Sequence, residues 1–335
     1  MIQRLINNPD KVVDDMLNGF LRVHESHVAL SMANPRVIFS KRSLEEPERV
    51  GLVSGGGSGY EPAFLGYLGK GLLDAVAVGE VFSSPGPTAF LEAIRVADRG
   101  NGVACLFGNY AGDSMNVQMA LRLAEDEGRH VAIVKARDDI ASAPKNAADK
   151  RHGIAGGVLM WKTAGAVAAG GGTLEEVIAV AEQTAQHTRS VCVGLAPCTI
   201  PAVGKPNFII DAGTYEFGIG HHGEAGQFVA PLDNAHKIAE SMVAALLDDF
   251  DLKTGSEFAV MLSGLGATPL MEQYLMAAPV IEALQRQGHT VWHTYVGDYV
   301  TSLDMNGLCL TLLQLDENLK SHLSSPASAL GLASL

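Results

Sequence analysis

Two adjacent histidines, His221 and His222, stand between glycines in residues 218–226. In such an open loop a neutral imidazole can act as a nucleophile toward a carbonyl carbon. A zinc site and an ordinary hydrogen-bonded histidine are the alternatives. Zinc is disfavoured, because adjacent side chains in extended chain point to opposite sides and neither HExxH nor a cysteine pair is nearby. The segment therefore indicates a catalytic or binding loop without a metal.

A glycine-rich segment, SGGGSGYEP at residues 54–62, directly follows an apolar run that ends at Val53. Several glycines let the backbone turn tightly and direct N–H groups toward a ligand oxygen. The spacing fits neither GxGxxG nor a P-loop, so it does not predict a nucleotide site. A plain strand-to-helix turn is the alternative interpretation.

The segment GNYAGD, residues 108–113, again follows an apolar run and precedes a helical pattern. In an open α/β sheet this edge is where ligands bind. Asp113 can accept a proton from a substrate hydroxyl, and a helix N-cap is the alternative role for the same residue. The sequence leaves both roles open.

The chain has four cysteines, Cys105, Cys192, Cys198 and Cys309, and none forms a CxxC pair. Three of them lie in apolar, strand-like runs, so we expect buried free thiols rather than a disulfide or a zinc site. Cys198, in the rigid turn PCTIP, lacks a base and is not expected to be catalytic. The loop at residues 299–304 is predicted to be a solvated connection.

These segments are positioned by alternating strand and helix patterns, which predict an α/β fold with helices packed on a largely parallel sheet. The alternation restarts after residue 190, so we expect two α/β domains, residues 1–186 and 187–335. A buried helix over residues 151–169 and a capped helix from Thr173, with Glu176 in a capping box, precede the boundary. Residues 324–335 are predicted to be a loose tail. The other strand candidates are residues 50–53, 75–78, 102–107, 130–135, 191–195, 258–262, 290–295 and 308–313, and the other helix candidates are residues 88–98, 115–126, 235–250 and 269–287.

Composition supports a globular enzyme, since 47% of the 335 residues are hydrophobic and 18% are charged. The formal net charge is −13, and Lys/Arg clusters are lacking, which argues against nucleic acid and anionic membrane as partners. The first ten residues have no apolar signal region, and no run approaches the roughly 20 apolar residues of a membrane span. We therefore expect a cytoplasmic protein.

Together these segments resemble the K subunit, or K domain, of dihydroxyacetone kinases over nearly the whole chain. The motifs that carry the resemblance follow an opening segment at residues 8–20 and are SGGGSGYEP (54–62), GEVFSSP (79–85), GNYAGD (108–113), RHGIAG (151–156), APCTIP (196–201), HHGEAG (221–226) and YVGDYVTSLDMNG (295–307).

The resemblance implies that His222 bonds covalently to the ketone carbon of the substrate as a hemiaminal. A covalent tether suits a small ketose, which offers few atoms for noncovalent binding. It further implies that Asp113 is the base on the hydroxyl that receives phosphate. Gly57 and Ser84 are expected to contact the substrate through their backbones.

The chain departs from the family pattern at Tyr60, where the family usually has histidine, and at Gly108, where it often has lysine. Both family residues contact substrate. A tyrosine still donates a hydrogen bond, and a glycine frees volume beside the substrate. We therefore predict a reshaped pocket that accepts a four-carbon ketose such as erythrulose at least as well as dihydroxyacetone.

The family's nucleotide and magnesium ions bind in a helical L module with clustered aspartates, and no such module follows Leu335. The expectation is a stand-alone, homodimeric K subunit without a cofactor of its own. Its partner is expected to be an L-type subunit that carries ATP or ADP with magnesium, or that is recharged by a phosphotransferase-system protein. The rival hypothesis is a ketose sensor that activates a transcription regulator.

Overall fold

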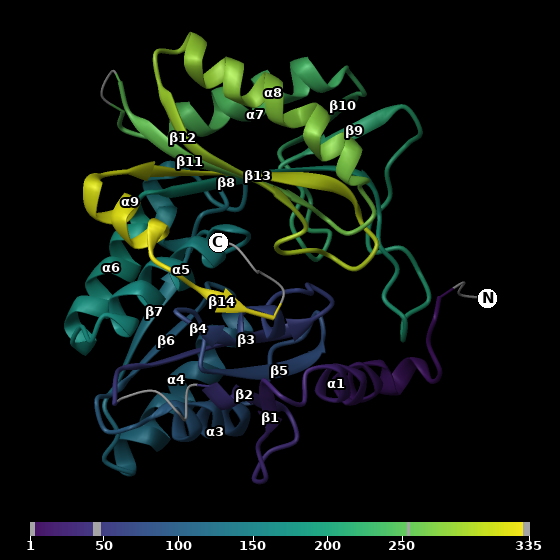
Figure 1. Cartoon of the computed structure of the whole chain (residues 1–335). Helices are drawn as coiled ribbons and strands as arrows, with labels where there is room; N and C mark the ends of the chain where they lie inside the picture. The colour runs from purple at the N-terminus through teal and green to yellow at the C-terminus, as the bar shows by residue number, and fades with distance from the viewer. Residues whose placement is uncertain (1–3, 43–47, 253–254, 331–335) are drawn as a thin grey trace.

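The computed structural model describes residues 4–42, 48–252 and 255–330, and it contains two six-stranded mixed sheets with helices on their faces (Figure 1). The α/β prediction is confirmed. The strands of the first sheet are β1 (Val28–Leu30), β2 (Val37–Ser40), β3 (Gly51–Ser58), β5 (Ala75–Val81), β6 (Val103–Gly108) and β7 (Val131–Ala136).

The first sheet has the order β1-β2-β5-β3-β6-β7. The neighbouring strands β5, β3, β6 and β7 pair in parallel. Strands β1 and β2 extend the sheet beyond β5 in antiparallel pairing. The apolar runs predicted as strands form this parallel part. Parallel pairing brings the carboxyl ends of β3, β5 and β6 to one edge, where the predicted motifs follow.

The second sheet has the order β10-β9-β8-β13-β11-β12 and is antiparallel except for the pair β11 and β12. The short strands β9 and β10 were not expected from the sequence. The strands of this sheet are β8 (Thr188–Ala196), β9 (Thr214–Phe217), β10 (Phe228–Pro231), β11 (Glu257–Gly264), β12 (Thr290–Gly297) and β13 (Asn306–Leu315).

The helices form layers on both sides of the two sheets, as Figure 1 shows. Helices α3 and α4 cover one face of the first sheet, α5 and α6 cover its other face, and α7 and α8 pack on the second sheet. Helix α5 contacts both sheets, so the largest core cluster joins the two halves. The helices are α1 (Val12–Val23), α3 (Pro87–Ala97), α4 (Ala111–Asp126), α5 (Gly156–Ala169), α6 (Leu174–Gln186), α7 (Ala235–Asp249), α8 (Leu270–Arg286) and α9 (Glu317–Ser324).

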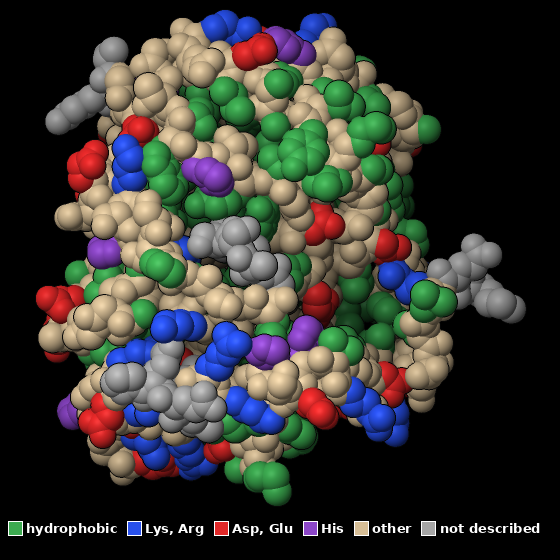
Figure 2. Space-filling model, viewed as in Figure 1, with side chains coloured by type: hydrophobic (Ala, Val, Ile, Leu, Met, Phe, Trp, Pro, Cys, Tyr) green, Lys and Arg blue, Asp and Glu red, His purple; other side chains and the backbone are tan. Residues whose placement is uncertain are grey.

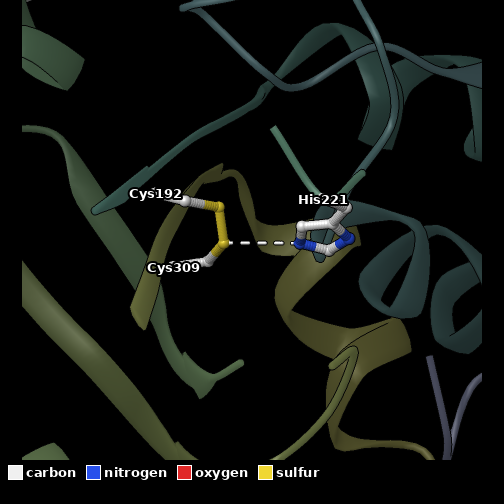
Figure 3. A group of neighbouring side chains, drawn as sticks. All are labelled: Cys192, His221 and Cys309. Carbon is white, nitrogen blue, oxygen red and sulfur yellow. Dashed lines mark hydrogen bonds between the residues drawn. A yellow bond between two sulfur atoms is a disulfide. The ribbon is translucent and has the colours of Figure 1, made fainter. Parts of the chain in front are cut away.

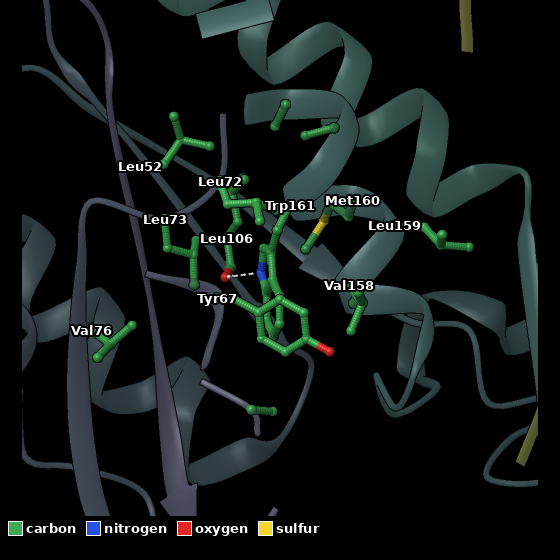
Figure 4. Close-up of a cluster of buried hydrophobic side chains, with 14 of the residues drawn as sticks. Leu52, Tyr67, Leu72, Leu73, Val76, Leu106, Val158, Leu159, Met160 and Trp161 are labelled. Carbon is green, nitrogen blue, oxygen red and sulfur yellow. Dashed lines mark hydrogen bonds between the residues drawn. The ribbon is translucent and has the colours of Figure 1, made fainter. Parts of the chain in front are cut away.

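Helix α5 lies between the two sheets, and close packing there explains why it is rich in small residues. A Cβ atom at Gly165 would lie 2.1 Å from the carbonyl oxygen of Gly71, so the helix and the turn approach each other closely there. The indole of Trp161 packs against the ring of Tyr67 and among aliphatic side chains, and it donates its Nε1 hydrogen to Leu106 O at 3.0 Å (Figure 4). The predicted helix starts too early, because residues 151–155 form a loop. The capping box of Thr173 and Glu176 is confirmed.

The C-terminal segment is ordered, which corrects the prediction of a loose tail for its described part. Helix α9 packs on α5, and strand β14 (Ser328–Ala329) pairs with β4 (Gly69–Lys70). The buried Lys162 on α5 donates its Nζ hydrogens to the carbonyl oxygens of His322 at 3.1 Å and Ser325 at 2.6 Å. Burial lowers the pKa of Lys162 to about 8. Residues 331–335 lie outside the described residues.

Two cysteines differ from the expectation of free thiols. Cys192 on β8 and Cys309 on β13 stand directly opposite each other in the antiparallel pair, with Cα atoms 3.9 Å apart, and form a disulfide (Figure 3). The prediction failed because the two residues are 117 positions apart in sequence and meet only through strand pairing. Cys105 and Cys198 are buried free thiols, as expected.

No helix among the described residues is both long and apolar enough for a bilayer crossing.

Candidate active site

A cavity of about 480 Å³ brings together the predicted loops of both halves. The carboxyl edge of the first sheet supplies most of its wall, and the second half supplies His221, His222 and Val300. All the predicted site residues line it: Gly57, Tyr60, Ser84, Gly108, Asp113 and His222. Further lining residues include Phe82, Tyr110, Asn116 and Trp161.

Residues 54–58 of the glycine-rich segment form the end of β3, and the turn begins only at Gly59, whose φ is 99°. The glycines in the strand are required by close packing. A Cβ at Gly56 would lie 2.5 Å from the ring of Phe64, and one at Gly57 would lie 2.7 Å from the backbone nitrogen of Ser83. The predicted tight turn is therefore wrong for these glycines, but their bare backbone does form a wall of the cavity.

His222 is held by contacts at both ring nitrogens. Its Nδ1 lies 2.6 Å from Glu224 Oε1, and its backbone N–H donates to Glu224 Oε2 at 2.9 Å. Its Nε2 lies 2.5 Å from the hydroxyl oxygen of Tyr60. Because a carboxylate only accepts hydrogen bonds, we assign the ring proton to Nδ1. The lone pair on Nε2 then accepts from Tyr60.

Glu224 is suited to hold this tautomer. Burial would raise the pKa of Glu224, but the hydrogen bonds from the His222 ring and backbone, and the charge that the ring carries when it is protonated, outweigh burial and bring the pKa to about 2. The carboxylate is therefore ionised across the physiological pH range. Glu224 was not predicted as a site residue, although it lies in the motif HHGEAG and its spacing of two residues from His222 was a usable signal.

Three aromatic rings enclose the His222 imidazole. The ring centroids of Tyr110, Phe82 and Tyr60 lie 5.1, 5.4 and 5.8 Å from that of His222, all in edge-on contact. The imidazole side chain is still 28% exposed, so one face remains open. Phe82 and Tyr110 were not predicted as site residues, even though both lie in the quoted motifs.

Tyr60 is a hydrogen-bond donor in this site. Burial, followed by the negative charges of Asp113 and Glu224, raises the pKa of Tyr60 well above its ordinary value. Its hydroxyl therefore keeps its proton near neutral pH. This agrees with the expectation that tyrosine donates here but does not act as a base.

Asp113 lies in the first turn of α4, where Tyr110 occupies the N-cap position, so the N-cap interpretation of Asp113 is wrong. Its Oδ1 accepts a hydrogen bond of 2.6 Å from the Ser84 hydroxyl. Burial raises the pKa of Asp113 to about 6, against the opposing effects of that hydrogen bond and of the His222 charge. The carboxyl group can thus take up or release a proton near neutral pH.

The loop GNYAGD is tied to the loop RHGIAG. Asn109 Nδ2 donates to Arg151 O at 2.8 Å, and the rings of Tyr110 and His152 stack with centroids 4.5 Å apart. Arg151 is buried and makes two hydrogen bonds of 2.7 Å to Asp249 on α7. This ion pair anchors the loop beside the cavity.

The loop at residues 299–304 is largely a buried connection, which corrects the prediction that it is solvated. Its backbone N–H groups bond to the glycine-rich segment, from Leu303 to Gly59 O at 2.7 Å and from Thr301 to Tyr60 O at 3.1 Å. Ser302 donates its hydroxyl hydrogen to the carbonyl oxygen of His221. The loop thereby connects the Tyr60 segment to the His222 segment.

Cys198 is not suited to act as a nucleophile, in agreement with the expectation from sequence. Burial raises the pKa of its thiol to about 11. Gly108, at the end of β6, lines the cavity. A Cβ added there would lie 3.1 Å from Gly153 O and 3.4 Å from the Tyr110 ring.

Comparisons with known proteins identify the family of this chain. Residues 18–331 match the model of the Dak1 domain. The dihydroxyacetone-binding subunit DhaK of the PTS-dependent dihydroxyacetone kinase 1 from Listeria innocua is 41% identical over 94% of this chain and 95% of its own. The L-erythrulose kinase of Pectobacterium atrosepticum is 37% identical over 97% of this chain, which spans 55% of that protein.

Among solved structures, the dihydroxyacetone kinase operon co-activator Dha-DhaQ superposes with a TM-score of 0.89 at 31% identity, over 95% of this chain and 98% of its own. The homologues thus include kinases of short ketoses and a co-activator. This chain belongs to the Dak1 domain family.

Proposed function

We propose that this chain is the substrate-binding subunit of a ketose kinase and holds dihydroxyacetone or a four-carbon ketose such as erythrulose on His222. The state of the His222 ring carries the proposal, because Glu224 occupies Nδ1 and leaves the Nε2 lone pair for an electrophile in the cavity. The kinases of dihydroxyacetone and L-erythrulose among the relatives support a short ketose as the substrate.

In the proposed capture step, the ketose displaces the Tyr60 hydroxyl from Nε2. The lone pair forms a bond to the carbonyl carbon, and the carbonyl π electrons move to the oxygen. That oxygen takes a proton from a water molecule, and the hydroxide ion that remains leaves to the solvent. The ring becomes positively charged, and ionised Glu224 stabilises it. Tyr60 then donates its hydrogen bond to the new hydroxyl oxygen. The product is a hemiaminal that fixes the substrate beside Asp113.

Asp113 is the proposed base for the substrate hydroxyl that receives the phosphate. Its pKa of about 6 leaves the carboxylate ionised at pH 7 and still basic enough to take a proton as the phosphoryl group is transferred. Ser84 orients the carboxylate through Oδ1, so Oδ2 remains for the substrate.

We propose that the nucleotide lies on an L-type partner subunit, with ATP or ADP and magnesium, and that this chain works in the cytoplasm without a cofactor of its own. The Listeria relative is named as a subunit of a PTS-dependent kinase. The first arrangement to assay is therefore one in which a phosphotransferase-system protein recharges the nucleotide on the partner subunit. The purified chain with ATP, magnesium and ketose should form no ketose phosphate. Turnover without a partner would contradict this arrangement.

The capture step is tested by diffraction from crystals soaked with dihydroxyacetone. Electron density should run without a break from Nε2 of His222 to the carbonyl carbon. A fully occupied ketose at van der Waals distance from Nε2 would contradict the covalent step. An intact-mass measurement on the same sample reports the adduct independently.

A ketose sensor is the second candidate function, and the similarity to the co-activator supports it. Tyr60 favours this candidate, because its raised pKa removes it as a proton acceptor. The test is to supply both an L-type subunit and a transcription regulator encoded beside this chain. Ketose binding without phosphorylation, together with ketose-dependent binding of the regulator, would favour the sensor over the kinase.

A homodimer is the proposed assembly. Leu270, Met271, Tyr274 and Leu275 are 52%, 70%, 59% and 59% exposed on α8, and Figure 2 shows hydrophobic side chains gathered over this helix. An apolar group of this kind often marks a protein interface. Light scattering should give twice the monomer mass, and Met271→Glu with Leu275→Glu should shift it toward the monomer.

A further inference from the structure

His221 and His222 are neighbours with different surroundings. His222 contacts Tyr60 and Glu224, whereas the Nε2 of His221 lies 3.5 Å from Cys309 Sγ. Cys192 Sγ completes a group of three in which all ligand atoms lie within 4.8 Å of one another (Figure 3). The mechanism proposed above uses none of these three side chains.

The separation between Cys309 and His221 fits a metal site, and the two sulfur atoms can take up ligand positions once their disulfide is reduced. In a tetrahedral site with metal–sulfur and metal–nitrogen bonds of about 2.3 and 2.0 Å, the sulfur and nitrogen lie about 3.5 Å apart. Cys309 Sγ and His221 Nε2 have that separation. The three side chains come from β8, β13 and the loop between β9 and β10, and each is at most 3% exposed.

The protonation states also suit a ligand set. Burial, and secondarily the charge of His222, lowers the pKa of His221 to about 4, so its imidazole is neutral and its Nε2 can donate an electron pair. Cys192 and Cys309 supply thiolates only when their disulfide is reduced. A dithiol reductant provides two electrons and two protons to the disulfide and becomes a disulfide itself. A bound cation then replaces the two thiol protons.

We propose that the reduced pair Cys192 and Cys309, together with His221, binds one thiophilic divalent cation of the zinc type. Two thiolates and an imidazole form a donor set that zinc prefers. Among the described residues, no other His, Cys, Asp or Glu joins these three at that spacing.

The bound cation would fix the backbone that presents His222. Ligation of His221 adds a side-chain link from its loop to both β8 and β13, whereas in the oxidised chain the Nε2 atom of His221 only lies near Cys309 Sγ of the disulfide. The two states exclude each other, since a disulfide offers no thiolate. The inference concerns residues outside the proposed catalytic set, so it does not depend on the proposed function.

The test uses the full-length chain, reduced with a dithiol, desalted without oxygen and titrated with Co²⁺. We expect thiolate-to-cobalt charge-transfer absorption that saturates at one equivalent and disappears when Zn²⁺ is added. The same chain with its disulfide intact should show none. A reduced wild-type chain without this absorption would overturn the proposal, whatever the variants do.

Variants assign the ligands. Cys192→Ser and Cys309→Ser should each lose most of the charge-transfer absorption, and His221→Gln should weaken Co²⁺ binding by about 100-fold or more, since even outer-shell losses cost about 10–100-fold. The matched controls are Cys105→Ser and Cys198→Ser, which change the other two buried cysteines. Absorption that survives in both ligand variants, or is lost in either control, would refute the assignment.

Discussion

Each half of the molecule brings one carboxyl group to the site. The first half supplies Asp113, and the second half supplies Glu224. Asp113 stands in the first turn of a helix, and burial raises its pKa to about 6. Glu224 stands two residues from His222, and its contacts with that histidine lower the pKa of Glu224 to about 2. Two carboxyl groups whose pKa values are driven apart by their surroundings are suited to different tasks.

The comparison assigns those tasks. The first half offers a group that exchanges a proton, whereas the second half offers a fixed charge that orients a nucleophile. The sheets that position the two carboxyl groups also differ. The parallel strands of the first sheet contribute several glycine-containing segments at one edge. The mainly antiparallel second sheet contributes two loops, which carry His222 and Val300 and are joined by the hydrogen bond from Ser302 to His221.

The largest expected effect comes from removing the nucleophile. His222→Ala should abolish the covalent ketose adduct, because no other nitrogen occupies the position of Nε2. Intact-mass measurement with excess dihydroxyacetone checks this. The matched control is His236→Ala, which removes an exposed histidine that also faces a glutamate, Glu240. An adduct that persists in His222→Ala would move the tether to another residue.

Asp113→Asn should lower kcat by about 10²–10⁴ in the enzyme reconstituted with an L-type subunit, the usual loss when a general base is removed. The adduct itself should still form, because His222 and Glu224 are unchanged. Asp126→Asn, at the other end of the same helix, is the control. Equal losses of adduct and of turnover would show that Asp113 acts in binding rather than in proton transfer.

Glu224→Gln should reduce adduct formation by roughly 10–100-fold, in line with the effect of removing a hydrogen-bond partner that orients a histidine. The amide can still accept from Nδ1, but it carries no charge to stabilise the imidazolium. Adduct yield against ketose concentration measures the effect. The surface variant Glu240→Gln changes the exposed pair with His236 and should leave the yield unchanged.

The pH dependence separates the two carboxyl groups further. Because the pKa of Asp113 is raised to about 6, kcat should be constant near pH 7 and fall by about tenfold per pH unit below pH 6, as the base becomes protonated. The pKa of Glu224 lies too low to contribute above pH 4. A profile of kcat at saturating ketose tests this, and in Asp113→Asn the break near pH 6 should disappear.

The smallest effect concerns the choice of ketose. Erythrulose should be used at least as well as dihydroxyacetone, because no side chain of residue 108 enters the cavity and Tyr60 supplies a hydrogen-bond donor to it. The values of kcat/KM for both ketoses, in the wild-type chain and in Tyr60→His and Gly108→Lys, decide this. A strong preference for dihydroxyacetone that neither substitution alters would mean that these two positions do not select the substrate.

Sequence patterns predicted most of the fold. Apolar runs placed the parallel strands of the first sheet within a few residues, and the capping box at Thr173 marked the start of α6. They missed β9 and β10, which are only four residues each and carry exposed side chains on β10. The division into domains at residue 186 remains a prediction, and α5 and α9 contact both halves.

The motifs also predicted which residues line the cavity, but not how these residues contact one another. The hydrogen bond between Tyr60 and His222 joins residues 162 positions apart, and no local pattern encodes it. The same holds for Cys192 and Cys309, which meet only through the register of β8 and β13. Local periodicity reports burial and secondary structure, whereas pairwise contacts depend on the complete tertiary arrangement.

The buried ammonium group of Lys162 has a consequence for synthesis on the ribosome. Its acceptors, the carbonyl oxygens of His322 and Ser325, are translated about 160 residues after it. Strand β4 likewise pairs with β14, which is translated much later. The N-terminal half can therefore form its sheet early, but the Lys162 ammonium group and the backbone edge of β4 have these partners only after residues 322–329 emerge. Packing of this half is thus completed by a segment that is translated about 160 residues after Lys162.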